Sequence, residues 1–153
     1  MTEDKSTQEV CVLVLDYGSP RSLWDIEGYY TRIRRGHRPS EEELQLLRHK
    51  YECIGGQSRL MESTAWQVER LQGELQQELP VAKVTVVQAH KYIEPLIADV
   101  AKELGHYDAV VVLMMNPYGT DVLNGSYLEQ IQSFSDTTWK VVHNWWDAPT
   151  LVQ

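Results

Sequence analysis

The chain has 153 residues, of which 42% are hydrophobic and 24% are charged, and its formal net charge at pH 7 is -8. This length allows one compact domain but not two ordinary ones, and the composition is that of a globular chain rather than a disordered one. The acidic balance excludes nucleic acid as a general partner, because phosphate backbones require broad basic surface.

No run of residues is apolar for long enough to span a bilayer, and residues 1–9 are polar and acidic, unlike a signal peptide. We therefore expect a cytoplasmic protein without a membrane span. The two cysteines, Cys11 and Cys53, have no CxxC or other metal-type spacing. We interpret both as buried thiols in a reducing compartment, with a disulfide as the less favoured alternative. Residues 1–8 are predicted to be a disordered tail, and residues 9–153 a single domain.

The first predicted element is a strand over residues 9–15, where a short β-branched apolar run is typical of a strand buried on both faces. Residues 16–20 are rich in helix and strand breakers and predict a turn. Apolar residues then recur at helical spacing over residues 23–33, and Gly36 ends this helix. Ser40 and Glu43 have the spacing of a capping box, which predicts that a second helix begins there.

Helices and strands continue to alternate through the rest of the chain. The predicted elements are a helix over 63–79, a strand over 84–87, a helix over 95–104, a strand over 109–115, a helix over 126–133 and a strand over 139–143. This alternation predicts an α/β fold of three layers, with a mostly parallel four-stranded sheet and helices on both faces. Ligands bind at the carboxyl ends of the strands in such sheets, so the turns at 16–19 and 116–120 should border the site.

An unusual concentration of positive charge follows the first predicted helix. Arg32, Arg34, Arg35 and Arg38 lie within seven positions of a strongly acidic chain. Guanidinium groups bind carboxylates or phosphates bidentately, which favours a site for an anionic ligand. A solvated face at a helix C-terminus is the alternative, since cations there are stabilised by the helix dipole. Arg34 follows Tyr30 by four residues and shares its face of the helix, so it is the arginine best placed to turn toward a cleft.

Tyr17 comes directly after the first predicted strand, at the edge where ligands bind. Its position alone favours a half-buried loop tyrosine. The alternative is a phenolate ligand to iron, because tyrosine is an attested axial ligand of haem iron. A phenol with a pKa near 10 is deprotonated at neutral pH only when a Lewis acid binds its oxygen.

Three segments together carry a resemblance to a known family: LDYGSP at 15–20, the arginine-rich run at 29–38 and IGGQS at 54–58. They resemble the N-terminal half of the bacterial ferrochelatases, most closely those of the coproporphyrin type in Gram-positive bacteria. The resemblance extends from about Cys11 to Val152. It implies a chelatase-like, flavodoxin-like half, a function in haem biosynthesis, and coproporphyrin III, iron-coproporphyrin or haem as the ligand. Fe²⁺ would be a substrate, and no cofactor would be required.

The resemblance also implies roles for particular residues. Tyr17 matches the tyrosine that faces the porphyrin metal, and so would be its axial ligand. The residues that match porphyrin-binding positions are Tyr17, Arg34, Lys50, Tyr51, Ser58 and Tyr127. From the residues alone, Tyr127 is equally consistent with a core-facing helical aromatic. The chain departs from the family at Lys50, where relatives often have arginine, and at Tyr118, where they commonly have histidine.

In the family, a second half supplies a histidine in an SAHSLP-like motif and a downstream glutamate, which accept pyrrole protons and deliver iron. This chain has neither motif, so we expect no catalytic residue in it and no iron insertion by the chain alone. A cluster of tryptophans (Trp139, Trp145 and Trp146) is typical of an interface. A complementary C-terminal half or a second copy of the chain is the expected partner.

Two other functions stay open. A haem-binding or porphyrin-binding carrier or sensor would keep the tyrosine ligand without the groups for proton transfer. A small chelatase that dimerises would instead build its cavity from two copies. The five histidines show no metal-type spacing, and we expect most of them at the surface. The sequence has no GxSxG, Walker or GxGxxG motif, so nucleophilic and nucleotide chemistry have no support.

Overall fold

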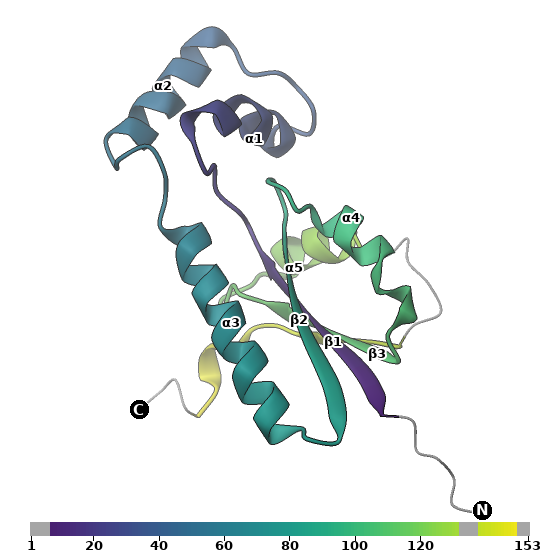
Figure 1. The fold of residues 1–153 in the computed structure, drawn as a ribbon. Helices are drawn as coiled ribbons and strands as arrows, with labels where there is room; N and C mark the ends of the chain where they lie inside the picture. Colours follow the sequence, from purple (N-terminus) through teal and green to yellow (C-terminus); the bar gives the residue numbers. More distant parts are fainter. Residues whose placement is uncertain (1–6, 132–137, 150–153) are drawn as a thin grey trace, which may run out of the picture.

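The computed structural model describes residues 7–131 and 138–149 (Figure 1). Most of the tail predicted over residues 1–8 lies outside these residues. The elements in chain order are β1 (Gln8–Asp16), η1 (Leu23–Asp25), α1 (Ile26–Ile33), α2 (Glu41–Glu52), α3 (Leu60–Glu78), β2 (Ala82–His90), α4 (Ile97–Lys102), η2 (Leu104–His106), β3 (Ala109–Met114), α5 (Asp121–Leu128), β4 (Thr138–Val142) and η3 (Trp145–Asp147).

The four described strands form one sheet in the order β2-β1-β3-β4, and every neighbouring pair is parallel. The predicted three-layer α/β fold is therefore confirmed, with a sheet that is wholly rather than mostly parallel. The apolar run of β1 is explained by burial on both faces. Cys11, Leu13 and Leu15 pack toward α4 and α5, whereas Val12 and Val14 pack toward α3.

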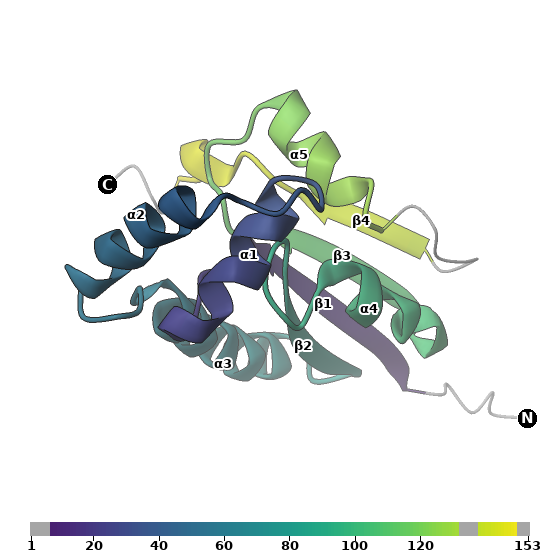
Figure 2. The same cartoon turned by 90° about the horizontal axis from the view of Figure 1, so that it is seen from above.

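Helix α3 covers one face of the sheet, whereas α4 and α5 lie on the other (Figure 2). Helices α1 and α2 cover neither face and stand beyond the carboxyl ends of β1 and β2 (Figure 1). Two glutamines of α3 also bond to the backbone of the edge strand β2. Val86 N donates to Oε1 of Gln72 at 2.7 Å, and Val84 N donates to Oε1 of Gln76 at 3.2 Å. These bonds satisfy backbone groups that an edge strand leaves unpaired.

Helix α2 begins where the sequence predicts, whereas α5 begins earlier than predicted. Ser40 and Glu43 form the predicted capping box at the start of α2. Helix α5 begins at Asp121 rather than at residue 126, because the side chain of Thr120 accepts a hydrogen bond from Leu123 N and caps it there. Residues 132–133 of that predicted helix lie outside the described residues.

The structure tests the predictions about the burial of the cysteines and histidines. The prediction that both cysteines are buried is wrong for Cys53, which is exposed near the end of α2, whereas Cys11 is buried as expected. Four of the five histidines are exposed, but His90 is only 2% exposed at the end of β2. None of the described helices has both the length and the apolar content needed to cross a membrane.

Candidate functional site

The turn after β1 carries Tyr17 to the carboxyl edge of the sheet. Tyr17 is 39% exposed, whereas Gly18 and Ser19 on its C-terminal side are buried. Gly18 has φ +78°, and a Cβ there would lie 2.5 Å from Cγ2 of Ile93 and 3.0 Å from Cβ of His90. Only glycine fits this conformation and this close approach. The turn is therefore held tightly against the connection between β2 and α4, with the Tyr17 ring outward.

Four tyrosines gather around this turn, and we call Tyr17, Tyr29, Tyr51 and Tyr92 the tyrosine cluster. The ring of Tyr17 packs edge-on against Tyr92 with centroids 4.7 Å apart, and Tyr29 lies 6.5 Å from Tyr17 and 6.4 Å from Tyr92. The Tyr51 hydroxyl is 3.2 Å from Oγ of Ser19. Helices α1 and α2 and the turns after β1 and β2 thus each supply one phenol to the same region.

Two phenols of the tyrosine cluster, Tyr17 and Tyr29, have raised pKa values. Burial, followed by the neighbouring Tyr92 and Tyr51, raises the pKa of Tyr17 above its ordinary value of 10. Burial likewise raises the pKa of Tyr29 and Tyr127. Phenols of this kind donate hydrogen bonds at neutral pH, and they become anionic ligands only when a Lewis acid binds the oxygen.

We call residues 30–38 the arginine-rich segment, and acidic residues compensate most of its positive charge. Ion pairs join Arg32 to Glu94 at 3.3 Å, Arg34 to Glu43 at 2.5 Å and Arg38 to Glu27 at 2.8 Å. All six side chains are more than a third exposed. Three of the four arginines are therefore paired with glutamates in the fold, and the fourth, Arg35, is exposed.

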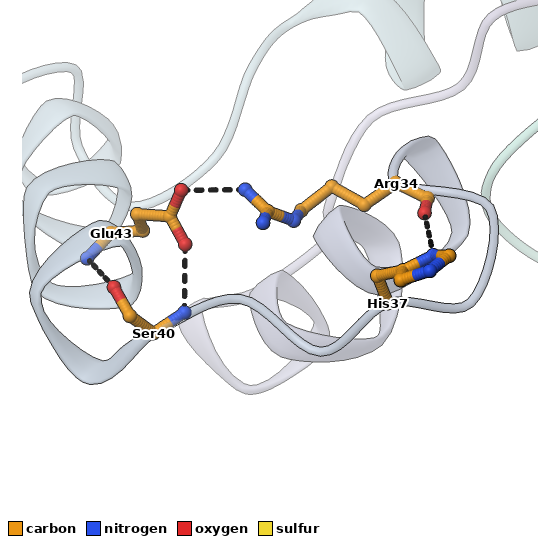
Figure 3. A network of polar contacts seen from close by, with 4 residues as sticks. All are labelled: Arg34, His37, Ser40 and Glu43. Carbon is orange, nitrogen blue, oxygen red and sulfur yellow. Dashed lines mark hydrogen bonds and ion pairs between the residues drawn. The ribbon is translucent and has the colours of Figure 1, made fainter.

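Arg34 extends from the end of α1 to the start of α2 (Figure 3). Its Nη1 donates to Oε1 of Glu43, and its guanidinium lies 5.7 Å from the ring centroid of Tyr30, as their spacing on the helix predicts. The other oxygen of Glu43 accepts from Ser40 N at 2.7 Å. Nε of Arg34 is buried and has no hydrogen-bond partner among the described residues. Arg34 thus has donor capacity that Glu43 does not use.

The other residues matched to porphyrin-binding positions have different surroundings. Lys50 is exposed on the last turn of α2. Ser58 accepts a hydrogen bond from Leu60 N at 3.1 Å, which leaves its hydroxyl proton available. Tyr127 is 3% exposed and belongs to the core beneath α5. Tyr17 and Tyr51 both lie in the tyrosine cluster, whereas the contacts of Arg34 are with Glu43 and Tyr30.

Sequence reasoning missed Lys91, which links Tyr127 to the tyrosine cluster. Its Nζ lies 5.2 Å from the ring centroid of Tyr92 and 4.9 Å from that of Tyr127, and it donates to Oγ of Ser126. A cation held against two aromatic faces at the carboxyl edge suits an anionic ligand. The available signal was its position directly after β2, the strand that pairs with β1.

A second missed feature is the buried pair of Asp16 and His90, at the ends of β1 and β2. The carboxylate of Asp16 bonds to Nδ1 of His90 and accepts from Nε2 of Gln88 at 3.0 Å. The signal was an aspartate that closes an otherwise apolar strand. Buried polar groups require partners, so such a residue predicts one on a neighbouring strand.

One concavity elsewhere in the described chain is apolar. An apolar hollow with a cavity volume of about 250 Å³ lies between α3, the sheet and η3 and is lined by Val14, Gln67, Val68, Leu71, Leu113, Met115 and Trp145. With no titratable side chain, it gives a charged ligand nothing to bind. Over residues 7–131 and 138–149, no three histidine, cysteine or acidic side chains converge on a possible metal site.

The chain is an α/β domain with an all-parallel sheet, and phenols and a lysine gather at the carboxyl edge, where such sheets bind ligands. The family model described as Ferrochelatase matches residues 9–153. The chain therefore belongs to the ferrochelatase family, as its sequence motifs indicated.

Several similar curated proteins are coproporphyrin III ferrochelatases. The chain is 34% identical to coproporphyrin III ferrochelatase of Staphylococcus saprophyticus, over 96% of this chain and 50% of that protein. It is 32% identical to coproporphyrin III ferrochelatase 1 of Bacillus anthracis, over 95% of this chain and 49% of that protein. It is 37% identical to the Staphylococcus epidermidis enzyme, over 85% and 43% respectively. The chain spans about half the length of the curated relatives it matches.

Proposed function

We propose that this chain binds coproporphyrin III, or its iron complex, and forms the porphyrin-anchoring half of a ferrous iron insertion site in haem biosynthesis. The observation that carries the proposal is Tyr17, a partly exposed phenol at the carboxyl edge of the central strand β1. Membership of the ferrochelatase family and the names of the relatives supply the substrate class.

In this proposal the residues divide into three kinds. Tyr17 approaches the porphyrin iron as its axial ligand, and loses its proton only when iron binds. The cations Arg34 and Lys50 bind propionate groups, and the hydroxyls of Tyr51 and Ser58 donate hydrogen bonds to them. Tyr127 is 3% exposed and supports the site from the core, through Lys91, whose Nζ lies 4.9 Å from the centroid of the Tyr127 ring. No cofactor is needed beyond the two substrates.

Iron insertion also requires bases that accept two pyrrole protons. The phenols of Tyr17 and Tyr29 have raised pKa values and are unsuited to this role. His90 and Asp16 are 3% and 5% exposed and already bonded to each other, so they do not reach a ligand. We therefore propose that the 153-residue chain binds porphyrin without turning it over, and that a complementary half or a second copy supplies the proton acceptors.

The burial of Asp16 and His90 beside the turn that carries Tyr17 also favours one alternative. This is a carrier or sensor that holds haem or another porphyrin without chemistry. The two functions differ in ligand preference. An anchoring half binds metal-free coproporphyrin III as well as the iron complex, whereas a carrier that depends on Tyr17 binds the iron complex selectively.

One titration tests the proposal. Coproporphyrin III and its ferric complex are added separately to the chain, and the Soret band is followed for each. Both should bind, and Tyr17→Phe should alter the spectrum of the iron complex while leaving the affinity for the metal-free porphyrin nearly unchanged. Tyr107→Phe is the matched control, because Tyr107 lies between η2 and β3, at the opposite edge of the sheet.

Three results would contradict parts of the proposal. Failure of both porphyrins to bind would overturn it entirely. An unchanged iron spectrum in Tyr17→Phe would remove Tyr17 as the ligand. For the third, the chain is mixed with coproporphyrin III and Fe²⁺ in the absence of air and of any other protein. Steady formation of iron-coproporphyrin there would overturn the expected inactivity.

A further inference from the structure

We infer that the buried Asp16–His90 pair is the positioning element for Tyr17. It fastens the turn after β1 to the turn after β2, so that the phenols of Tyr17 and Tyr92 are presented together at the edge of the sheet. The consequence for iron ligation rests on the proposed function above, whereas the positioning itself concerns the chain without ligand.

The pair joins neighbouring strands at their carboxyl ends. Asp16 and His90 are direct partners in the parallel register of β1 and β2. Nδ1 of His90 bonds to one oxygen of Asp16, and Nε2 of Gln88 donates to the other at 3.0 Å. Both carboxylate oxygens are therefore held by β2. Since the side chains are only 5% and 3% exposed, water does not readily replace these partners.

The backbone around the pair is equally constrained. Lys91 N donates to the Asp16 carbonyl oxygen at 3.0 Å, which extends the contact of the two strands by one residue. Gly18 lies against the Cβ of His90 and against Ile93, with no room for a side chain. The turn that carries Tyr17 thus rests on His90 and is bounded by Asp16 before it.

This arrangement explains how a partly exposed tyrosine has a defined place. Tyr17 is 39% exposed, so packing surrounds only part of its side chain. Its ring nevertheless meets that of Tyr92 edge-on, with 4.7 Å between centroids and an interplanar angle of 63°. Tyr17 follows Asp16 by one residue, and Tyr92 follows His90 by two. The bond between Asp16 and His90 therefore fixes the backbone from which both aromatic side chains extend.

The opposite ends of the same two strands provide an internal comparison. Glu9 and Lys83 are also register partners on β1 and β2, and they form an ion pair at 2.7 Å. Their side chains are 38% and 65% exposed, so this pair is solvated and fixes little. Burial therefore distinguishes the Asp16–His90 pair from the solvated pair of Glu9 and Lys83.

The first test measures the tyrosine rings in the ligand-free chain by NMR, with ring-labelled tyrosine and assignment by Tyr17→Phe and Tyr92→Phe. Asp16→Ala should move the ring signals of Tyr17 and Tyr92 toward those of a solvent-exposed tyrosine. Asp16→Asn should restore most of the native shifts, because its amide oxygen still accepts from His90. Glu9→Ala, which removes the solvated pair, should leave both rings unchanged.

Loss of stability is controlled separately. Val12→Ala truncates a buried side chain of the same strand on the α3 side and destabilises the fold without touching the pair. The inference is overturned if Asp16→Ala leaves both rings in place, or if Val12→Ala at equal loss of stability displaces them as much. It is also overturned if Asp16→Asn fails to restore the shifts.

The second test uses the ferric coproporphyrin complex, in which a phenolate ligand gives a charge-transfer band. Asp16→Ala should weaken this band severalfold at saturating porphyrin, and Asp16→Asn should restore it. If Tyr17→Phe leaves the band unchanged, Tyr17 is not the iron ligand. The NMR signals of the Tyr17 and Tyr92 rings then still test whether the Asp16–His90 pair positions them. If Tyr17→Phe abolishes the band but Asp16→Ala leaves it intact, the positioning inference fails and the proposed function stands.

Discussion

The arginine-rich segment and the tyrosine cluster meet at helix α1 but satisfy their polar groups in different ways. Arg32, Arg34 and Arg38 are each paired with a glutamate. The phenols of the tyrosine cluster are packed edge-on against one another, and Tyr51 shares a hydrogen bond with Ser19. A carboxylate that reaches Arg34 therefore competes with Glu43 or uses the donors that Glu43 leaves free, whereas a flat ligand that reaches the tyrosine cluster meets aromatic rings.

This difference assigns separate energetic roles to the two regions. Exchange of one carboxylate for another at an exposed guanidinium contributes little net affinity, but it selects and orients an anionic ligand. Aromatic side chains instead contribute contact area and edge or face interactions to a macrocycle. We therefore expect affinity to depend mainly on the tyrosine cluster, and selectivity for porphyrin carboxylates mainly on the cations.

The largest effect should come from the base of the tyrosine cluster. Tyr29 is 7% exposed, and Tyr29→Ala should lower the free energy of unfolding by about 3 kcal/mol, as expected for loss of a buried aromatic side chain. Tyr30→Ala, at the adjacent half-buried position, should cost about 1 kcal/mol. Urea unfolding measures both. Equal losses would show that the tyrosine cluster is no better packed than the arginine-rich segment.

A smaller effect is expected at the junction between the arginine-rich segment and α2. Ser40→Ala removes the side chain that caps α2 and should lower the free energy of unfolding by about 1 kcal/mol. Ser63→Ala is a suitable control, because Ser63 is exposed in the first turn of α3. If both substitutions prove neutral, the capping box does not stabilise the entry to α2.

The sequence predicted features that depend on neighbours in the chain. The capping box of Ser40 and Glu43 requires a spacing of only three residues, and the apolar run of β1 is itself evidence for a strand buried on both faces. The family motifs likewise located Tyr17 and Tyr51, both of which lie in the tyrosine cluster. Local pattern and motif were therefore sufficient for the fold class and for part of the candidate site.

Features that depend on distant partners could not be predicted in the same way. The pairing of Arg32 with Glu94 joins residues 62 positions apart, and Asp16 bonds to a histidine 74 positions away. Both depend on which strands become neighbours and in which register. Cys53 was mistaken for a buried residue because cysteine is usually buried, although it follows the last turn of α2 on its exposed side. Average burial does not determine the orientation of one side chain.

A third prediction concerns Glu43, which belongs to both α2 and the contact with Arg34. Its pKa is lowered, first by the backbone hydrogen bond from Ser40 and then by Arg34, with burial acting in the opposite direction. The stabilisation from this carboxylate is therefore complete above its ordinary pKa of 4.5 and is lost as the pH falls through the lowered value. Glu43→Gln should flatten this acid part of a stability profile measured by thermal unfolding.

The same substitution tests whether Glu43 competes with a ligand for Arg34. Glu43→Gln should tighten binding of coproporphyrin III at neutral pH severalfold, and Arg34→Gln should weaken it. Glu41→Gln is the matched control, since Glu41 also lies in the first turn of α2 but pairs with Arg48 at 3.7 Å. Unchanged affinity in both Glu43→Gln and Arg34→Gln would show that Arg34 only joins α1 to α2.

The smallest perturbation uses the two thiols as reporters of the two regions. Burial raises the pKa of the Cys11 thiol to about 11, so only about a thousandth of it is thiolate at pH 8. Cys53 is exposed near the end of α2. The native chain should therefore react with a chromogenic disulfide at one thiol rapidly and at the second only after unfolding. Cys53→Ser should abolish the rapid phase.

The reaction rates of the two thiols in a Tyr29→Ala variant show which region the substitution loosens. Cys11 lies within β1, whose end carries Tyr17, so loss of the buried Tyr29 should speed the slow thiol by increasing opening of the core. Cys53 is already accessible, and its rate should stay the same. Faster reaction at Cys53 with no change at Cys11 would mean that Tyr29 supports α2 rather than the sheet. The tyrosine cluster would then belong structurally to the arginine-rich segment, and the division of roles between the two regions would be wrong.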